Sequence, residues 1–193
     1  MSKKVLVACE YSQIVTSAFL EVGADAYSCD IIDTTGPYPE RHFKMDALEC
    51  ANAIDWDLII AHPPCTYMCI ASARHMYKGG SLFLPRFEQA MKAKDFFLSF
   101  LSIDKCPICV ENPIPLKVVQ LPTETQRFCV TQFGEKYSKK VCLWLKDLPP
   151  LIPYVDCVLH HTQFVKRGHD GHSRSKFFPN VAKAMAEQWY TLL

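Results

Sequence analysis

Chemically capable side chains stand at the ends of apolar segments of this chain: Glu10, Asp30 and Cys65. Cys65 ends His62-Pro-Pro-Cys65, directly after the apolar run Trp56–Ala61. Two prolines stiffen the backbone and fix the direction of the cysteine that follows. A thiolate held at a strand end suits covalent catalysis, although cysteine is more commonly a small buried apolar residue.

A second motif, Glu111-Asn-Pro113, follows the apolar run Ile108–Val110. If both runs are strands of one parallel sheet, Glu111 and Cys65 meet above neighbouring carboxyl ends. A thiolate beside a carboxylic acid that hydrogen-bonds a ring nitrogen can add to a pyrimidine. The two motifs together therefore predict nucleophilic chemistry on such a ring.

Two further acids indicate a nucleotide site. Asp30 ends the predicted strand Ala26–Asp30, where doubly wound folds commonly place an acid that accepts hydrogen bonds from ribose hydroxyls. A solvated aspartate at a strand end is the alternative. Asp46 sits where the next strand should end, and it can also cap the predicted helix Leu48–Ile54, so both roles can hold together.

The elements that must position these residues alternate between strand and helix patterns. A buried strand Val5–Ala8 precedes a helix over Gln13–Val22 that Gly23 ends, and Arg86–Ser102 is an amphipathic helix. This alternation predicts an α/β fold with a doubly wound, mostly parallel sheet. Residues 62–85 form a predicted long loop at the carboxyl ends of the strands, where open α/β sheets bind ligands.

The second half of the chain shows weaker patterns. Gln126–Gln132 and Val141–Leu145 predict an antiparallel pair around Gly134, and Asn180–Leu193 predicts a closing helix. Residues 146–179 are rich in proline and histidine and are predicted to be irregular. We expect one domain over 1–193, with 146–179 as a short insertion.

Composition excludes several classes. The 193 residues carry 21 Lys+Arg and 20 Asp+Glu, a net charge of +1, and 49% are hydrophobic, which is typical of an ordered globular protein and argues against a polyanion-coating one. No run approaches the roughly 18 apolar residues that span a bilayer. The N-terminus reaches Glu10 too soon for a secretory signal, so the ten cysteines indicate free thiols in a reducing cytoplasm.

At these motifs the sequence resembles the DNA cytosine-5 methyltransferases, especially short phage and prophage members. That family carries its nucleophile in Pro-Pro-Cys, as in Pro63-Pro64-Cys65, and its glutamate in Glu-Asn-Val, where this chain has Glu111-Asn112-Pro113. Asp30 and Asp46 match its cofactor-binding acids. Phe133-Gly134 followed by Lys139 and Val141, and residues 179–186, are similar to later motifs of the family.

The resemblance implies a Rossmann-like class I methyltransferase fold, S-adenosylmethionine as cofactor, no metal, and DNA as partner. It implies that Cys65, Glu111 and Lys139 are catalytic. The loop 66–80, with Arg74, His75 and Tyr77, and Lys139 would hold a flipped base and its phosphate. The implied cofactor-binding residues are Ala8, Cys9, Glu10, Tyr11, Ser12, Asp30, Ile31, Asp46, Ala47, Pro63 and Ser175.

The chain departs from the family in four places. The first loop, Cys9–Gln13, has no glycine, so the backbone must approach the cofactor differently, and Glu10 could meet its ammonium group. Lys139 is the one charge where two arginines are expected, and a lysine cannot form the same bidentate fork. Ser175 replaces an asparagine. The target-recognition domain is missing or minimal, and residues 160–176, with four cations, one acid and four histidines, are either a phosphate-contacting loop or a solvated one.

Alternatives remain open from the sequence. A related enzyme acting on a free pyrimidine nucleotide or a single-stranded nucleic acid keeps Cys65 and Glu111 and needs no recognition domain. A non-catalytic module that binds nucleic acid or a host-defence protein is the second. A structural zinc site at Cys106 and Cys109, completed from Cys157 and nearby histidines, is a weaker hypothesis because Cys109 lies in an apolar strand. A specificity partner and a homo-oligomer are also left open.

Overall fold

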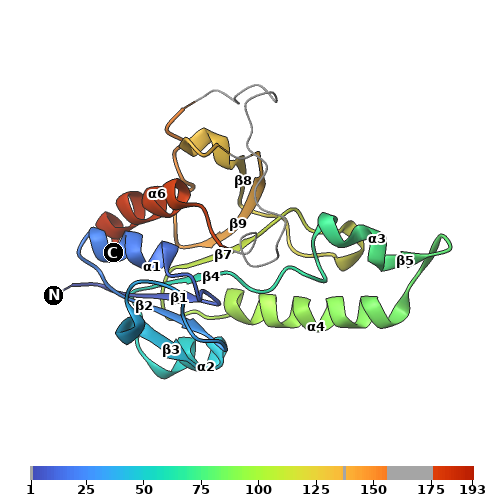
Figure 1. The fold of residues 1–193 in the computed structure, drawn as a ribbon, viewed down its shortest axis with the longest axis horizontal. Coiled ribbons are helices and arrows are strands. Elements are labelled where there is room, and N and C mark those ends of the chain that lie inside the picture. The colour runs from blue at the N-terminus through green and yellow to red at the C-terminus, as the bar shows by residue number, and fades with distance from the viewer. Residues whose placement is uncertain (1, 137, 156–175) are drawn as a thin grey trace.

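A seven-stranded sheet forms the centre of the protein, with strand order β3-β2-β1-β4-β7-β9-β8 (Figure 1). The computed structural model describes residues 2–136, 138–155 and 176–193. From β3 to β7 neighbouring strands pair in parallel, whereas β9 is antiparallel to both β7 and β8. The strands are β1 (Lys4–Ala8), β2 (Asp25–Asp30), β3 (His42–Lys44), β4 (Leu58–Ala61), β7 (Ile108–Asn112), β8 (Gln126–Cys129) and β9 (Lys140–Lys146).

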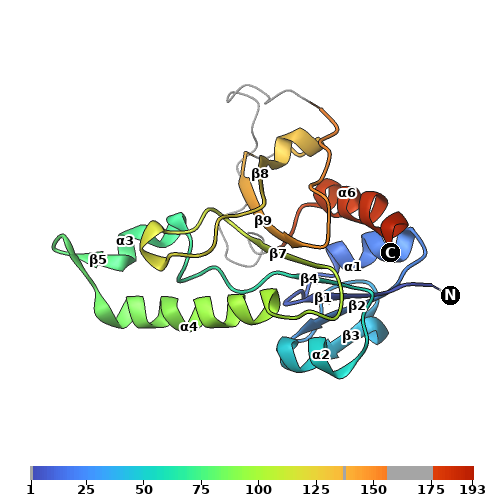
Figure 2. The same cartoon turned by 180° about the vertical axis from the view of Figure 1, so that it is seen from behind.

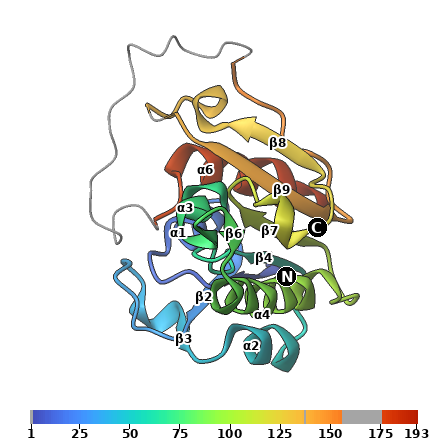
Figure 3. The same ribbon diagram turned by 90° about the vertical axis from the view of Figure 1, so that its right-hand side faces the viewer.

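Helices cover both faces of this sheet (Figure 3). One face packs against α1 and α6, and the other against α2 and α4, so the buried apolar residues form two clusters separated by the sheet. The α-helices are α1 (Ile14–Glu21), α2 (Ala47–Ala53), α3 (Ala73–Met76), α4 (Leu84–Leu101) and α6 (Pro179–Trp189). The 3₁₀ turns are η1 (Pro39–Arg41), η2 (Ile70–Ser72), η3 (Lys117–Val119), η4 (Val130–Phe133) and η6 (Tyr190–Leu192).

This strand order confirms the predicted fold class. Five parallel strands, then antiparallel β9 between β7 and the last strand β8, give a doubly wound, Rossmann-like α/β sheet. The chain winds outward from β1 to β3 and then returns to β4 on the other side of β1. Ligands of open α/β sheets bind at such a reversal, beside the carboxyl ends of the strands.

Local sequence explains where the elements begin and end. Strands β1 and β4 are apolar without alternation because helices cover both sides of the sheet. Helix α1 ends before Gly23, which adopts a φ of +89° that a residue with a Cβ rarely takes. Asp46 caps α2 by accepting hydrogen bonds from the backbone N–H groups of Leu48 and Glu49. These helices and strands match the predicted segments within a few residues, and β8 with β9 forms the predicted antiparallel pair.

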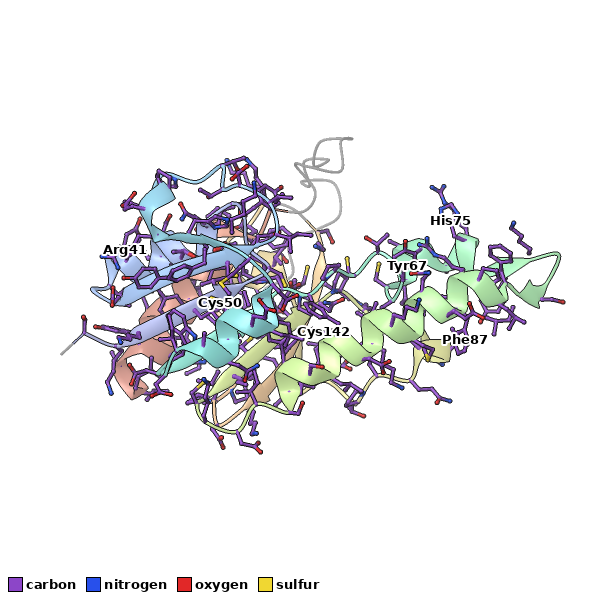
Figure 4. All side chains as sticks on the ribbon, turned by 90° about the horizontal axis from the view of Figure 1, so that it is seen from below. Arg41, Cys50, Tyr67, His75, Phe87 and Cys142 are labelled. Atoms are coloured by element: carbon purple, nitrogen blue, oxygen red, sulfur yellow. The ribbon has the colours of Figure 1, made fainter. Side chains whose placement is uncertain are left out.

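The prediction of a long loop over 62–85 was wrong in part. This segment contains η2, α3 and a hairpin of β5 (Tyr77–Lys78) and β6 (Ser81–Leu82), and α4 begins at Leu84 rather than Arg86. Gly79 and Gly80 both have positive φ, as a two-residue hairpin turn requires, and buried Met68 and Met76 anchor the segment. The part of this segment from η2 to β6, together with the start of α4, projects away from the sheet, and we call it the arm (Figures 1, 2 and 4).

The predicted irregular segment is described only in part. Residues 147–155 contain no helix or strand, while 156–175 lie outside the described residues. Among the helices of the described ranges, none is long and apolar enough to cross a membrane.

Candidate active site

A pocket of about 460 Å³ opens at the carboxyl ends of β1, β2, β4 and β7. It brings together residues that are far apart in the sequence, because parallel strands deliver their carboxyl ends to one edge of the sheet. The sequence-predicted residues that line it are Cys9, Glu10, Tyr11, Ser12, Asp30, Ile31, Asp46, Ala47, Pro63, Cys65, Glu111 and Lys139.

Cys65 lies in a tight turn that follows the two prolines after β4. Its carbonyl oxygen accepts hydrogen bonds from the N–H groups of Met68, at 3.0 Å, and Cys69, at 3.1 Å. The turn is fixed further by Leu116, whose N–H donates to the Met68 carbonyl at 2.7 Å. The thiol is half-buried and reaches the pocket, as Pro63-Pro64-Cys65 predicted.

The Cys65 thiol is hydrogen-bonded to the thiol of Cys69, which the sequence interpretation left without a role. This hydrogen bond, together with burial, raises the pKa of Cys65, while the Lys139 ammonium acts to lower it. The same bond lowers the pKa of Cys69 to about 6, assisted by backbone N–H groups of Ala71 and Ser72. The pair of thiols therefore loses one of its two protons readily. The remaining proton lies on Cys65, and Cys69 carries the negative charge of the thiolate.

Glu111 occupies the carboxyl end of β7, and the residue exposes only 7% of its surface. Its neighbour Asn112 donates a hydrogen bond from Nδ2 to the carbonyl oxygen of Pro63 at 2.8 Å. This bond ties the strand end that carries Glu111 to the proline motif that carries Cys65. The two motifs that sequence analysis paired are thus held to each other directly.

His62 also lines the pocket, and sequence analysis assigned it no role. Its Nδ1 atom lies 3.0 Å from Oε2 of Glu111, and its ring packs against Phe177 with centroids 4.7 Å apart. The sequence does contain one signal for His62, its position immediately before Pro63. A following proline restricts the backbone of His62 at the end of β4.

Lys139 lies just before β9 and lines the pocket. Its ammonium group stands 5.2 Å from the centre of the Phe178 ring, a cation–π arrangement that orients the side chain. It is close enough to Cys65 to act on the ionisation of the thiol. Lys176 and Phe177 line the pocket beside it.

Asp30 and Asp46 lie near each other at the ends of β2 and β3. Both acids act to raise the pKa of Cys9, whose thiol is also buried, so the three side chains face one region. Both backbone bonds of Asp46 use Oδ1, which leaves its second oxygen available to a ligand. Ile31 exposes 72% of its surface and lines the same part of the pocket.

The glycine-free first loop adopts left-handed backbone nonetheless. Cys9 has a φ of 59° and Gln13 one of 56°, conformations that glycine adopts more easily. Gln13 is fully buried, and its side chain donates to the carbonyl oxygen of Tyr38 at 2.7 Å and accepts from the Tyr38 N–H at 2.9 Å. This tertiary contact holds the strained loop in place.

Glu10 serves a different role from the one expected. Its carboxylate accepts hydrogen bonds from the N–H groups of Val15, at 2.7 Å, and Thr16, at 3.1 Å, and from the Thr16 hydroxyl at 2.7 Å. Glu10 thereby caps the start of α1, where the N–H groups lack helical partners. These three bonds do not favour the expectation that its carboxylate meets a cofactor ammonium.

Other predicted residues lie elsewhere. Ala8 is fully buried within β1 and does not line the pocket, although its carbonyl oxygen accepts a hydrogen bond from the His62 N–H at 2.9 Å. Ser175 lies outside the described residues. In the loop 66–80, Thr66 lines the pocket, whereas Arg74, His75 and Tyr77 belong to α3 and β5 of the arm and do not line it. Figure 4 shows His75 on the arm.

The zinc hypothesis gains no support from the described part of the chain, where no group of three metal-binding side chains occurs. Cys106 and Cys109 are both buried, and burial raises the pKa of each thiol, which disfavours the thiolate that zinc binds. Cys157 and the histidines at 160, 161, 169 and 172 lie outside the described residues.

No protein-family model matches the chain, and no curated protein matches it. Among solved structures, one described as a proposed DNA modification methyltransferase encoded within an E. coli prophage aligns with a TM-score of 0.42 and 13% identity. The match covers 75% of this chain and 46% of the other, so the chain spans less than half the length of that protein. The fold assignment rests on the strand order, and likeness at this level does not bear on the reaction.

Proposed function

We propose that this protein is an S-adenosylmethionine-dependent methyltransferase that acts on C5 of cytosine in DNA. The observation that carries the proposal is one pocket that is lined by a nucleophile, an acid and a pair of carboxylates: Cys65, Glu111, Asp30 and Asp46. These are the groups that methyl transfer to a pyrimidine carbon requires. DNA as partner and the cytoplasm as location belong to the same proposal.

The cofactor half of the pocket fits a nucleoside. Asp30 offers a carboxylate to ribose hydroxyls, Asp46 retains one oxygen for an amine, and exposed Ile31 offers an apolar surface to a planar ring. The left-handed Cys9 supplies the chain turn that a glycine would otherwise provide. When bound, the cofactor would supply an electrophilic methyl group.

The other half of the pocket, which contains Cys65 and Glu111, would activate the cytosine ring. The Cys65 sulfur adds to C6 of cytosine while its proton passes to Cys69, and the C5–C6 electron pair moves onto C5 and the ring. Glu111, as the carboxylic acid, donates a hydrogen bond to N3 and accepts one from the exocyclic amine, and so stabilises the negative charge that develops on the ring. After C5 has gained the methyl group, a water molecule takes the C5 proton, the C5–H electron pair re-forms the C5–C6 double bond, and the carbon–sulfur bond breaks to release the Cys65 thiolate.

Lys139 would contribute positive charge. It acts to lower the pKa of Cys65, and it lines the pocket, so its ammonium group could pair with a phosphate or a negatively charged ring. A base within duplex DNA must leave the stack to reach Cys65, which costs a few kcal/mol. Thr66 and Lys139 at the pocket are the residues we assign to holding the flipped nucleotide.

The test is covalent trapping. The protein is incubated with labelled S-adenosylmethionine and DNA that contains 5-fluorocytosine, whose C5 substituent cannot leave as a proton. We expect a stable protein–DNA adduct that Cys65→Ser abolishes. Cys129→Ser is the matched control, since that half-buried thiol does not line the pocket.

An adduct that persists in Cys65→Ser would exclude Cys65 as the nucleophile. A parallel reaction with 5-fluorodeoxycytidine monophosphate separates the substrates. If an adduct forms with the nucleotide and none forms with DNA, the substrate is a free pyrimidine nucleotide and not DNA. If calorimetry detects no binding of S-adenosylmethionine, the result favours the alternative that the protein is a non-catalytic module.

A further inference from the structure

His62 is joined to Glu111 in the floor of the pocket. Its Nδ1 atom lies 3.0 Å from Oε2 of Glu111, and the two side chains are only 12% and 10% exposed. The contact spans 49 positions of sequence and links the end of β4 to the end of β7. The shielding makes this hydrogen bond stronger than one in open water.

The backbone around His62 leaves this side chain little freedom. The His62 N–H donates to the carbonyl oxygen of Ala8 at 2.9 Å, which holds the residue against β1. Pro63 follows it, and the carbonyl oxygen of Pro63 accepts the hydrogen bond from Asn112, next to Glu111. The Phe177 ring covers the imidazole. His62 and Glu111 are therefore fixed relative to each other by bonds that neither side chain itself makes.

The surroundings of the imidazole select its tautomer. Nε2 is buried and has no hydrogen-bond partner among the described residues. If the ring is neutral with its proton on Nδ1, Nδ1–H donates to Oε2 of the Glu111 carboxyl group and only the acceptor Nε2 is left unpaired. A doubly protonated ring would leave a buried N–H donor unpaired, which costs more. The Nδ1–H tautomer therefore fits the site.

We propose that His62 is a positioning residue: its Nδ1–H donates to Oε2 of the Glu111 carboxylic acid, so that Oε1–H is directed to donate to N3 of the pyrimidine, while Oε2 also accepts from the exocyclic amine. This role rests on the proposed function. This one fixed hydrogen bond from His62 restricts the rotation of the Glu111 carboxyl group.

Two nearly isosteric substitutions distinguish positioning from packing. In His62→Asn the amide nitrogen stands in for Nδ1 and can still donate to Glu111, whereas in His62→Gln the donor occupies the place of Nε2. His62→Leu fills the volume with no donor. We measure kcat and KM for methyl transfer to DNA, and the affinity for S-adenosylmethionine by calorimetry.

We expect His62→Gln and His62→Leu to lower kcat by about 10- to 100-fold, as the loss of such an orienting partner commonly does, while cofactor affinity stays within about twofold. His62→Asn should retain kcat within about fivefold. Equal kcat in all three variants and the wild type would overturn the positioning role. Equal loss in His62→Asn and His62→Leu, with unchanged melting temperature, would also overturn it.

The adduct with 5-fluorocytosine DNA separates this proposal from the proposed function. If the wild type forms no adduct with DNA or nucleotide, the proposed function fails and the role of His62 fails with it. If the wild type forms the adduct, and His62→Leu forms it at the same rate, only the role of His62 fails. A slowed adduct in His62→Leu that His62→Asn restores supports both.

Discussion

Replacing Cys69 should slow the reaction of Cys65 with a small electrophile, whatever the natural substrate. The two thiols are hydrogen-bonded, and Cys69 holds the negative charge of the pair. When Cys65 is alkylated its proton must leave, and the Cys69 thiolate is placed to accept it. Cys69→Ser keeps the size and a hydrogen-bonding group but provides no thiolate.

The magnitude follows from the pKa of Cys69. A thiol with the ordinary pKa of 9.0 is ionised to roughly 3% at pH 7.5, whereas the lowered pKa of Cys69 makes the thiolate the main form of the pair at that pH. The wild-type pair thus carries at least about tenfold more thiolate than an unperturbed thiol. Burial raises the pKa of Cys65 when it has no such partner. We expect alkylation of Cys65 at pH 7.5 to be about 10- to 30-fold slower in Cys69→Ser.

The direction with pH is also fixed. Because the pKa of Cys69 is lowered, the wild type should keep its reactivity down to about pH 6 and lose it as the pH falls through that value. In Cys69→Ser the reactivity of Cys65 should be lost already as the pH falls through a value above 9.0, since burial raises the pKa of the remaining thiol. The midpoint of the pH–rate curve should therefore move upward.

The assay is alkylation by iodoacetamide between pH 5.5 and 9.5, with each cysteine followed by peptide mass spectrometry. Cys9 lines the same pocket and is the internal control, because burial and not Cys69 sets its pKa. Its rate should be the same in both proteins. Identical pH–rate curves for Cys65 in the wild type and Cys69→Ser would refute this role of Cys69.

Three further substitutions, the last with a matched control, test residues that hold the pocket in shape or line it. Glu10→Gln replaces a carboxylate that accepts three hydrogen bonds, and we expect it to lower the free energy of unfolding by about 2–4 kcal/mol in urea titrations; a loss below about 0.5 kcal/mol would contradict the capping role. In Gly36→Ala the new Cβ would stand 2.4 Å from the Gln13 side chain, so we expect a loss of about 1–3 kcal/mol, and an unchanged melting temperature would show that the Gln13 contact is dispensable. Asp30→Asn should weaken S-adenosylmethionine binding about tenfold by calorimetry, as expected for one lost charge-assisted hydrogen bond. Asp33→Asn, at an exposed position outside the pocket, should not; equal weakening in both would argue against a ribose contact.

The sequence was sufficient to predict the fold class and the proximity of the two central motifs, Pro63-Pro64-Cys65 and Glu111-Asn112-Pro113. Short apolar runs without alternation, separated by helical patterns, indicate parallel strands of a sheet covered on both faces, and the carboxyl ends of parallel strands share an edge. From this alone, Cys65 and Glu111 were expected to meet, and both line the pocket. The arm was missed because the two strands on either side of its turn, Gly79-Gly80, are only two residues long, too short to show an alternating pattern.

Tertiary structure decided how individual side chains are used. A strand end fixes where a residue lies but not which of its neighbours a flexible side chain contacts, and so Glu10 turned to cap α1. The same reason hid the thiol pair of Cys65 and Cys69 and the bond from His62 to Glu111. Sequence pattern therefore determined which elements bring chemistry to this pocket, whereas hydrogen bonds between distant segments determined the partner of each group, because those bonds form only once the sheet has brought the segments together.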